Sequence, residues 1–216
     1  MIETVLTPDR ILDAAEQALT KYGLAKATVV DVARALGVSH GSVYRHFPSK
    51  AALRDAVTER WLARVSVPLG RIAAEDTPAP ERLRRWFDAL IAIKRQKVLA
   101  EPELFATYRA IVGDSREVVQ AHVEALSAQV AAIVADGVRR GEFIAVDPVV
   151  TGRAIFYATA RFHDPSHAAE WTDPGVDRAF EDVWALIERG LVPAVRKGRA
   201  KTSKGGGQTD RRSSRS

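Results

Sequence analysis

The sequence has 216 residues, of which 46% are hydrophobic, with a formal net charge of +5 and no cysteine. Such a chain can bury a sizeable core, as one elongated domain or two small ones. The lack of cysteine excludes disulfides, thiol sensing and zinc-finger chemistry, and it is compatible with a reducing cytoplasm. We see no signal peptide, and no uninterrupted apolar run approaches the ~18–20 residues of a membrane span. We therefore expect a cytoplasmic protein that does not bind a membrane.

The positive charge is concentrated at the C-terminus. Residues 196–216 carry eight basic side chains against Asp210, whereas the rest of the chain carries 24 basic and 26 acidic side chains. Glycine, serine and like charges cannot offset the entropy of ordering, so we predict a disordered basic tail over 196–216. The tail is either an additional phosphate contact or an inert solubilising end. Residues 1–195 are nearly neutral, so DNA binding by this part of the chain depends on where its basic side chains lie.

A first helix is predicted to begin at Thr7 and Pro8, with Thr7 as N-cap and Pro8 at the first helical position. An apolar stripe at helical spacing follows, and Gly23 ends it. The stripe consists of Ile11, Ala15, Ala18, Leu19 and Tyr22. We expect this helix to support the segment that follows.

Residues 28–50 predict two short helices around a tight turn. Gly37 lies where the first helix must end, because glycine adopts the left-handed conformation without a Cβ penalty. Ser39 can cap the second helix by accepting a hydrogen bond from a free backbone N–H. The apolar residues of each helix share one face: Val32, Ala33 and Leu36 in the first, Val43 and Phe47 in the second.

The polar residues of the second helix have an order that suits DNA. Small or hydrogen-bonding side chains open it and larger aromatic or basic ones follow: His40, Gly41, Ser42, then Tyr44, Arg45 and His46. This suits a helix whose N-terminal end approaches base edges while its far end contacts phosphates. An ordinary helical hairpin shares the apolar stripes and the glycine turn, so the pattern alone leaves both interpretations open.

The segment over residues 10–53 resembles, without a gap, the TetR family of transcriptional repressors. The matching positions are Ala15, Gly23, Thr28, Ala33, Gly37, Val38, Gly41, Tyr44, His46, Phe47 and Lys50. The resemblance implies an all-helical, omega-shaped homodimer that binds a palindromic operator in double-stranded DNA. It also implies release by a small-molecule effector, unidentified here, that binds in the C-terminal domain.

The resemblance assigns the DNA contacts by position. Tyr44, His46 and Lys50 match phosphate-contacting positions, and Thr28 matches a helix cap that often touches the backbone. The positions that read bases follow the cap at Ser39 and are His40, Gly41 and Ser42. Arg45 is suited to contact either a base or a phosphate. The alternative is that Tyr44 only packs the hairpin and that Lys50 is a solvated lysine.

The rest of the chain predicts further helices. Ser49 caps a connecting helix over 49–67, which ends near Val67 and Pro68, and residues 69–80 look like a junction. Later helices are predicted from Glu81, from Pro102, over 115–140, from Asp147 through Phe162, and from Asp173. No stretch alternates like a strand, so the fold class is all-α. We place the DNA-binding domain at 7–50 and the ligand-binding and dimerisation domain at 51–195.

The aromatic residues of the C-terminal half are either an effector cavity or packed core. The effector candidates are Trp86, Phe105, Tyr108, Arg109, His122, Phe156 and Tyr157. The helix from Glu81 carries an apolar stripe that reaches Lys94, and His122 lies on the stripe of the longest helix. Arg109 and Arg161 would suit an anionic effector.

The last two long helices are predicted to form the dimer. The first has small residues that allow close approach, including Gly152, and the last has an apolar seam. The interface candidates are Ala154, Ala158, Phe180, Val183, Trp184 and Ile187. Half of a four-helix bundle leaves its apolar face in water unless a partner covers it.

Three other functions are compatible with parts of the sequence. A metal-responsive repressor would use His122, His163 and His167. The cluster with metal-ligand residue types is His163, Asp164 and His167, but Pro165 interrupts its helical spacing, so we predict no metal and no other cofactor. An architectural or cell-division protein with the same fold would bind many chromosomal sites without an effector. An enzyme is disfavoured, because no nucleophile elbow and no glycine-rich phosphate loop is present.

Overall fold

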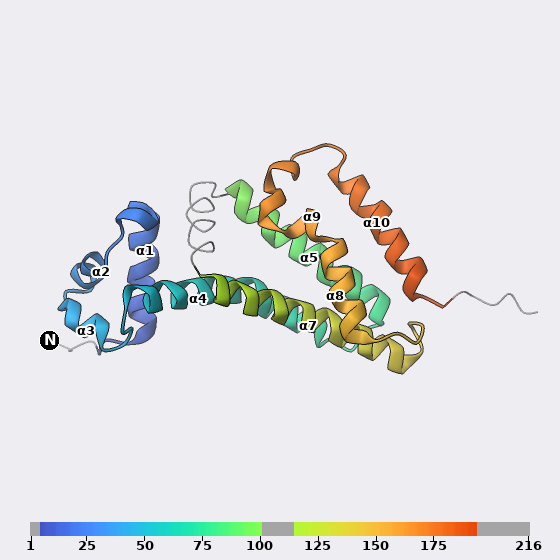
Figure 1. The fold of residues 1–216 in the computed structure, drawn as a ribbon, viewed down its shortest axis with the longest axis horizontal. Helices are drawn as coiled ribbons and strands as arrows, with labels where there is room; N and C mark the ends of the chain where they lie inside the picture. The colour runs from blue at the N-terminus through green and yellow to red at the C-terminus, as the bar shows by residue number, and fades with distance from the viewer. Residues whose placement is uncertain (1–4, 101–114, 194–216) are drawn as a thin grey trace, which may run out of the picture.

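The computed structural model describes residues 5–100 and 115–193, which form helices joined by short turns and contain no strand (Figure 1). The all-α class is therefore confirmed. Several predictions lie outside the described residues: the helix at Pro102, the effector candidates Phe105, Tyr108 and Arg109, and the tail over 196–216.

Three helices form the N-terminal unit: α1 (Pro8–Lys26), α2 (Val29–Leu36) and α3 (His40–Tyr44). Thr7 caps α1 as predicted, because its Oγ1 accepts a hydrogen bond from the backbone of Arg10 at 3.4 Å. Gly23 interrupts the helix with φ of 73°. Tyr22 is exposed rather than packed on the apolar stripe, so its predicted place in the core is wrong.

Helix α4 (Lys50–Ala73) is longer than predicted and passes through the expected end at Pro68. Proline removes one hydrogen bond from the helix and usually kinks or ends it. Here Val65 and Leu69 are both buried, one on each side of the proline, while Pro68 itself is exposed. Burial on both sides offsets the lost hydrogen bond, and the predicted junction becomes the last turns of α4.

The C-terminal unit contains α5 (Ala79–Ala100), α7 (Arg116–Arg140), α8 (Pro148–Ala158), α9 (Ala160–His163), the 3₁₀ helix η1 (Pro165–Glu170) and α10 (Val176–Leu191). The helix predicted to run unbroken from Asp147 through Phe162 is divided at Thr159. The Thr159 hydroxyl donates to the carbonyls of Ile155 and Phe156, and such bonding bends a helix. The last helix begins later than predicted because Asp173 instead accepts from Gly175 in a turn.

The buried apolar side chains form two separate cores. Helices α1, α2 and α3 surround the N-terminal core, and α5, α7, α8, α9 and α10 surround the C-terminal core. Helix α4 runs between the two units (Figure 1) and contributes to both, with Leu53, Val57 and Trp61 in the first and Val65 and Leu69 in the second. No single residue therefore separates the two units.

One described helix, α7, is long and apolar enough to cross a membrane by length and composition. Alanines and valines raise its hydropathy without forming an uninterrupted apolar run, so its sequence alone did not predict this property. Its largest apolar side chains are buried in the C-terminal core: Leu126, Val130, Ile133 and Val134. Burial among other helices is the ordinary reason for such a composition.

Candidate nucleic-acid interface and effector site

The turn between α2 and α3 has the predicted geometry. Gly37 adopts φ of 66° and ψ of 29°, and the amide of Val38 donates to the carbonyl of Ala33 at 3.0 Å. At the other end of α2, Thr28 and Asp31 cap the helix reciprocally. The hydrogen bond from Thr28 lowers the pKa of the Asp31 carboxyl, so this cap persists at neutral pH. Both ends of α2 are thereby fixed.

Helix α3 carries two polar rows on either side of buried Val43. In the first row, Ser39 Oγ accepts from the Ser42 amide at 3.2 Å, and Arg45 Nη2 donates to Ser42 Oγ at 3.0 Å. In the second row, the rings of His40 and Tyr44 meet edge to face with centroids 6.3 Å apart. The rows follow helical spacing, since each partner lies three or four residues from the other.

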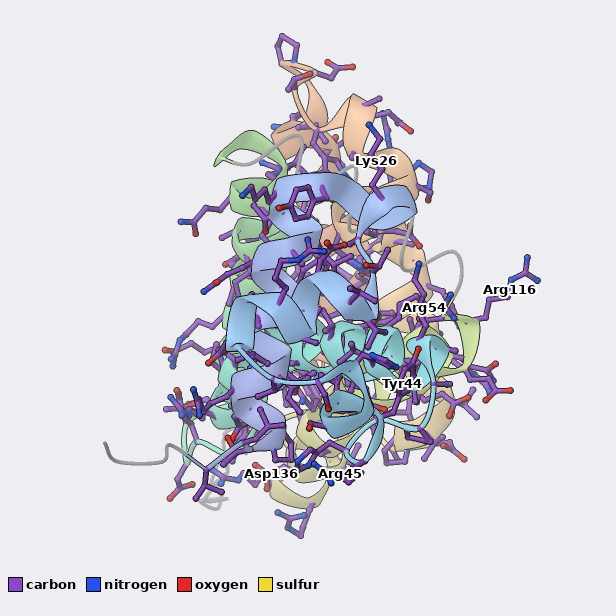
Figure 2. All side chains as sticks on the ribbon, turned by 90° about the vertical axis from the view of Figure 1, so that its left-hand side faces the viewer. Lys26, Tyr44, Arg45, Arg54, Arg116 and Asp136 are labelled. Atoms are coloured by element: carbon purple, nitrogen blue, oxygen red, sulfur yellow. The ribbon has the colours of Figure 1, made fainter. Side chains whose placement is uncertain are left out.

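The predicted DNA contacts belong to the N-terminal unit and the start of α4. Figure 2 looks onto the end of the molecule formed by the N-terminal helices and labels Tyr44 and Arg45 there. All nine candidates are exposed except Ser42, which is half-buried: Thr28, Ser39, His40, Gly41, Ser42, Tyr44, Arg45, His46 and Lys50. No acidic residue occurs between Ser39 and Arg54. Local charge is therefore positive here although the body is nearly neutral, which favours contact with phosphates.

The aromatic effector candidates divide into inner and outer residues. Trp86 and Phe156 are buried, and Trp86 Nε1 donates to Gln129 Oε1 at 3.0 Å. Tyr157 is 60% exposed on the outer side of α8. Its predicted role in lining an internal effector site is therefore wrong, because the helix turns its side chain away from the core.

His122 has the features expected of a polar residue in an apolar interior. It lies on α7, and its Nε2 is buried without a hydrogen-bond partner. Burial lowers the pKa of His122 to about 4, with a further contribution from the nearby Lys94. The imidazole is therefore neutral at physiological pH. Two residues that the sequence analysis did not list as site residues, Lys94 and Gln129, also belong to this interior.

The histidines proposed for a metal site are held apart by other interactions. His163 lies in the core and its Nε2 is 3.2 Å from both Thr159 Oγ1 and the Phe156 carbonyl. Asp164 instead caps η1 by accepting from Ser166, and His167 Nδ1 is 2.8 Å from Glu170 Oε1. Within residues 5–100 and 115–193, no three His, Asp or Glu side chains converge as metal ligands do.

The predicted dimer seam of α10 faces its own protomer. Phe180 and Trp184 are buried in the C-terminal core, where Trp184 lies 5.8 Å from the Phe87 ring and Phe180 lies 5.2 Å from Phe162. Their assignment to the interface is wrong for this reason. Val183 and Ile187 are half-buried, whereas Ala154 and Ala158 are exposed on α8.

Two family models match the chain in the same order as its two helical units. Residues 11–57 match the model of bacterial regulatory proteins of the tetR family, and residues 79–184 match the tetracyclin repressor-like C-terminal domain. The chain belongs to the TetR family of DNA-binding transcriptional regulators. The first match contains α2, α3 and their turn, and the second contains most of the C-terminal core.

Relatives of this TetR-family chain match it over part of its length. It is 38% identical over 80 residues to the HTH-type transcriptional regulator Rv1255c of Mycobacterium tuberculosis, covering 37% of this chain and 40% of that protein. It is 35% identical over 77 residues to the nucleoid occlusion factor SlmA of Vibrio atlanticus, covering 35% and 39%. The matches thus span less than half of these relatives.

The fold similarity extends further than the sequence similarity. SmeT, the repressor of the Stenotrophomonas maltophilia multidrug efflux pump SmeDEF, superposes with a TM-score of 0.60 over 88% of this chain and 92% of its own, at 21% identity. SmeT is also solved as a triclosan complex, with a TM-score of 0.62 at 17% identity. At this identity the likeness shows the fold alone.

Proposed function

We propose that the protein is a homodimeric repressor that occupies palindromic DNA and leaves it when a small molecule binds in the C-terminal core. The exposed, acid-free surface of α3 and the start of α4 carries the DNA-binding part of the proposal. SmeT, whose fold is similar, is a repressor and has been solved with a small molecule. The site of action would be the cytoplasm, where the chromosome lies.

Helix α4 is suited to couple the two units because it contributes to both cores. A chain of hydrogen bonds connects it to the effector domain: Trp86 Nε1 donates to Gln129, whose Nε2 donates to the Ser66 carbonyl at 3.0 Å. Near the DNA-binding unit, Ser115 Oγ donates to Asp55 Oδ1 at 2.6 Å. A ligand that moves α5 or α7 therefore moves α4. Tenfold weaker DNA binding requires about 1.4 kcal/mol of such coupling.

The dimer is assigned to the outer faces of α8 and α10. Val150, Ala154 and Tyr157 lie on one exposed face of α8, and Leu186 on α10 is 66% exposed. Large apolar side chains at such positions are covered in the assembled form of many proteins. A palindromic operator has half-sites one DNA turn apart, ~34–36 Å. The two α3 helices of a dimer must therefore be held at that separation.

Replacing Leu186 with aspartate is expected to give folded monomers. An unpaired charge in the centre of an apolar interface costs about 3 kcal/mol, which corresponds to a roughly 100-fold rise in the dimer dissociation constant. Sedimentation equilibrium measures the dissociation constant, and circular dichroism verifies the helical fold. Glu188→Gln, on the same helix, is the control and leaves association unchanged. A Leu186→Asp dimer as tight as wild type would contradict this interface.

Replacing Lys50 with alanine is expected to weaken binding to all DNA sequences similarly. The loss of one phosphate contact per protomer flattens the slope of log affinity against log salt by roughly 2 per dimer. His40→Ala instead alters which bases are preferred, since base-edge contacts specify sequence. Binding selections with randomised half-sites, repeated at several salt concentrations, separate the two effects.

Arg178→Ala is the control for charge, because Arg178 is exposed on α10 in the C-terminal unit and its removal changes the net charge equally. It should leave the salt slope unchanged. If Lys50→Ala altered preference at one base pair and left overall affinity intact, the phosphate assignment would be wrong.

A second candidate function is an architectural or cell-division role, which the match to SlmA favours. Genome-wide binding distinguishes the two functions. A few strong sites beside promoters support a local repressor, whereas many sites distributed along the chromosome support the architectural role.

A further inference from the structure

Lys94 is a buried cation to which the described residues offer no hydrogen bond or ion pair. It lies on the inward stripe of α5, together with Phe87, Leu90 and Ile91, and is only 8% exposed. None of the described side chains forms a hydrogen bond or an ion pair with its ammonium group. Arg82, on the same helix and equally buried, shows the usual arrangement, since it donates to Asp136 and to the carbonyl of Glu75.

Burying the ammonium group of Lys94 opposes folding. Burying a charge that forms no hydrogen bond or ion pair is unfavourable, and most proteins avoid it. Burial lowers the pKa of Lys94 to about 8, assisted by Lys97 and opposed by Asp164. Lys94 therefore remains mostly protonated at neutral pH. A cation kept inside at this cost is available for an anion that the described residues do not supply.

His122 offers a second free donor near this cation. Helices α5 and α7 run antiparallel, since Arg82 is bonded to Asp136 and Trp86 to Gln129, and this register places Lys94 opposite His122. His122 Nε2 is a buried nitrogen that lacks a partner. His163 is also close to Lys94, but its Nε2 is already engaged by Thr159 and the Phe156 carbonyl. The neutral imidazole of His122 donates from Nε2 in the tautomer that carries the proton on that nitrogen. The free donors are therefore one ammonium group and one imidazole.

This donor set selects a class of ligand. Only one of these two groups is charged, and its single positive charge matches the single negative charge of a carboxylate, whereas a phosphate group carries about −1.5 to −2 and would keep an unpaired charge in this interior. The surroundings are aromatic: the His163 ring lies 4.7 Å from Phe156 and 6.2 Å from Phe87. An apolar body attached to the carboxylate suits such walls.

We infer that the interior between α5, α7 and α9 binds a monocarboxylic acid, with Lys94 pairing with the carboxylate, His122 donating to it, and the apolar body packing against Phe87 and Phe156. This inference rests on the proposed function, because it names the chemical class of the effector. It differs from the sequence analysis, which assigned anion binding to Arg109 and Arg161. Of these two, Arg161 is exposed and pairs with Glu170.

Matched acids and alcohols test the inference on the full-length protein without DNA. The pairs are octanoate with 1-octanol and phenylacetate with 2-phenylethanol, measured by calorimetry to millimolar concentration. We expect at least one acid to bind wild type about tenfold more tightly than its alcohol. In Lys94→Met that ratio falls to about one. Lys97→Met, which removes the same charge one turn along α5, keeps the wild-type ratio.

Two further measurements do not depend on the variant binding ligand. Without ligand, Lys94→Met should melt at a higher temperature than wild type, because an unpaired buried charge is removed. In wild type, acid affinity should fall as the pH rises past about 8, while alcohol affinity stays constant. His122 and His163, with pKa values of about 4, and Asp164, whose pKa is lowered, do not titrate there. Lys97 is the remaining basic group near Lys94, and repeating the pH dependence in Lys97→Met separates its titration from that of Lys94.

The inference is overturned if wild type binds none of the acids, if acid and alcohol bind equally, or if Lys94→Met keeps the preference. Should Lys94→Met fail to fold, the pH dependence in wild type decides in its place. Release from DNA is measured in a separate assay. Its probe is the genomic DNA fragment that the protein binds most strongly in a genome-wide binding selection. Acid binding that leaves DNA affinity unchanged supports this site and contradicts the effector role. Release by the alcohols alone supports the proposed function and overturns this site.

Discussion

Replacing Trp184 with aspartate is expected to unfold the C-terminal unit rather than to separate a dimer. Trp184 is 3% exposed and packs against Phe87 and Phe180 in the core of its own protomer. Truncating a buried tryptophan costs about 3–5 kcal/mol, and an unpaired carboxylate in its place adds to this. The total approaches the whole stability of a domain of this size. Near-ultraviolet circular dichroism and thermal unfolding measure the loss of packing directly.

The control is Leu186→Asp, which places the same charge on the exposed face of the same helix. It should retain a cooperative unfolding transition and near-wild-type helix content, even where it dissociates the dimer. A Trp184→Asp protein that is folded, monomeric and as stable as wild type would restore Trp184 to the interface and contradict the packing of α10 described here.

Features set by neighbours close in sequence were predicted well. The caps at Thr7, Ser39 and Ser49 depend on donors within three residues, and each accepts the expected hydrogen bond in the structure. Gly37 ends α2 for the same local reason. The exposed polar rows of α3 follow from these caps and from helical spacing. Their contact with DNA stays a prediction until the Lys50 and His40 variants are measured.

Features set by distant packing were predicted poorly. Periodicity shows which face of a helix is covered but not what covers it. The seam containing Phe180 was therefore assigned to a partner, although α5 and α9 cover it. Pro68 signals a helix end locally, yet burial of Val65 and Leu69 against α7 and α5 carries α4 past it. Lys94 was recognised on an apolar stripe, but no local signal shows that a lysine there is buried and that the described residues give it no hydrogen bond.

Gly152 illustrates the same difficulty and gives the second large prediction. Its small size indicated close approach at the dimer interface, but the structure buries it against α7. A Cβ added at Gly152 would lie 2.7 Å from the backbone nitrogen of Ala131 and 2.8 Å from its Cα. Backbone atoms cannot rotate away as the end of a side chain can, so α7 and α8 must separate. We expect Gly152→Ala to destabilise the protein by about 2–3 kcal/mol.

The sign of this change is informative because helix propensity opposes it. Alanine is favoured over glycine inside a helix by about 1 kcal/mol, so without a clash the substitution would stabilise α8. Gly190→Ala supplies that reference, since Gly190 lies in α10 and an added Cβ meets no atom within 4 Å. Chemical denaturation of both variants should move the midpoint in opposite directions. Two midpoints that both rise would show that α7 and α8 do not approach as closely as described.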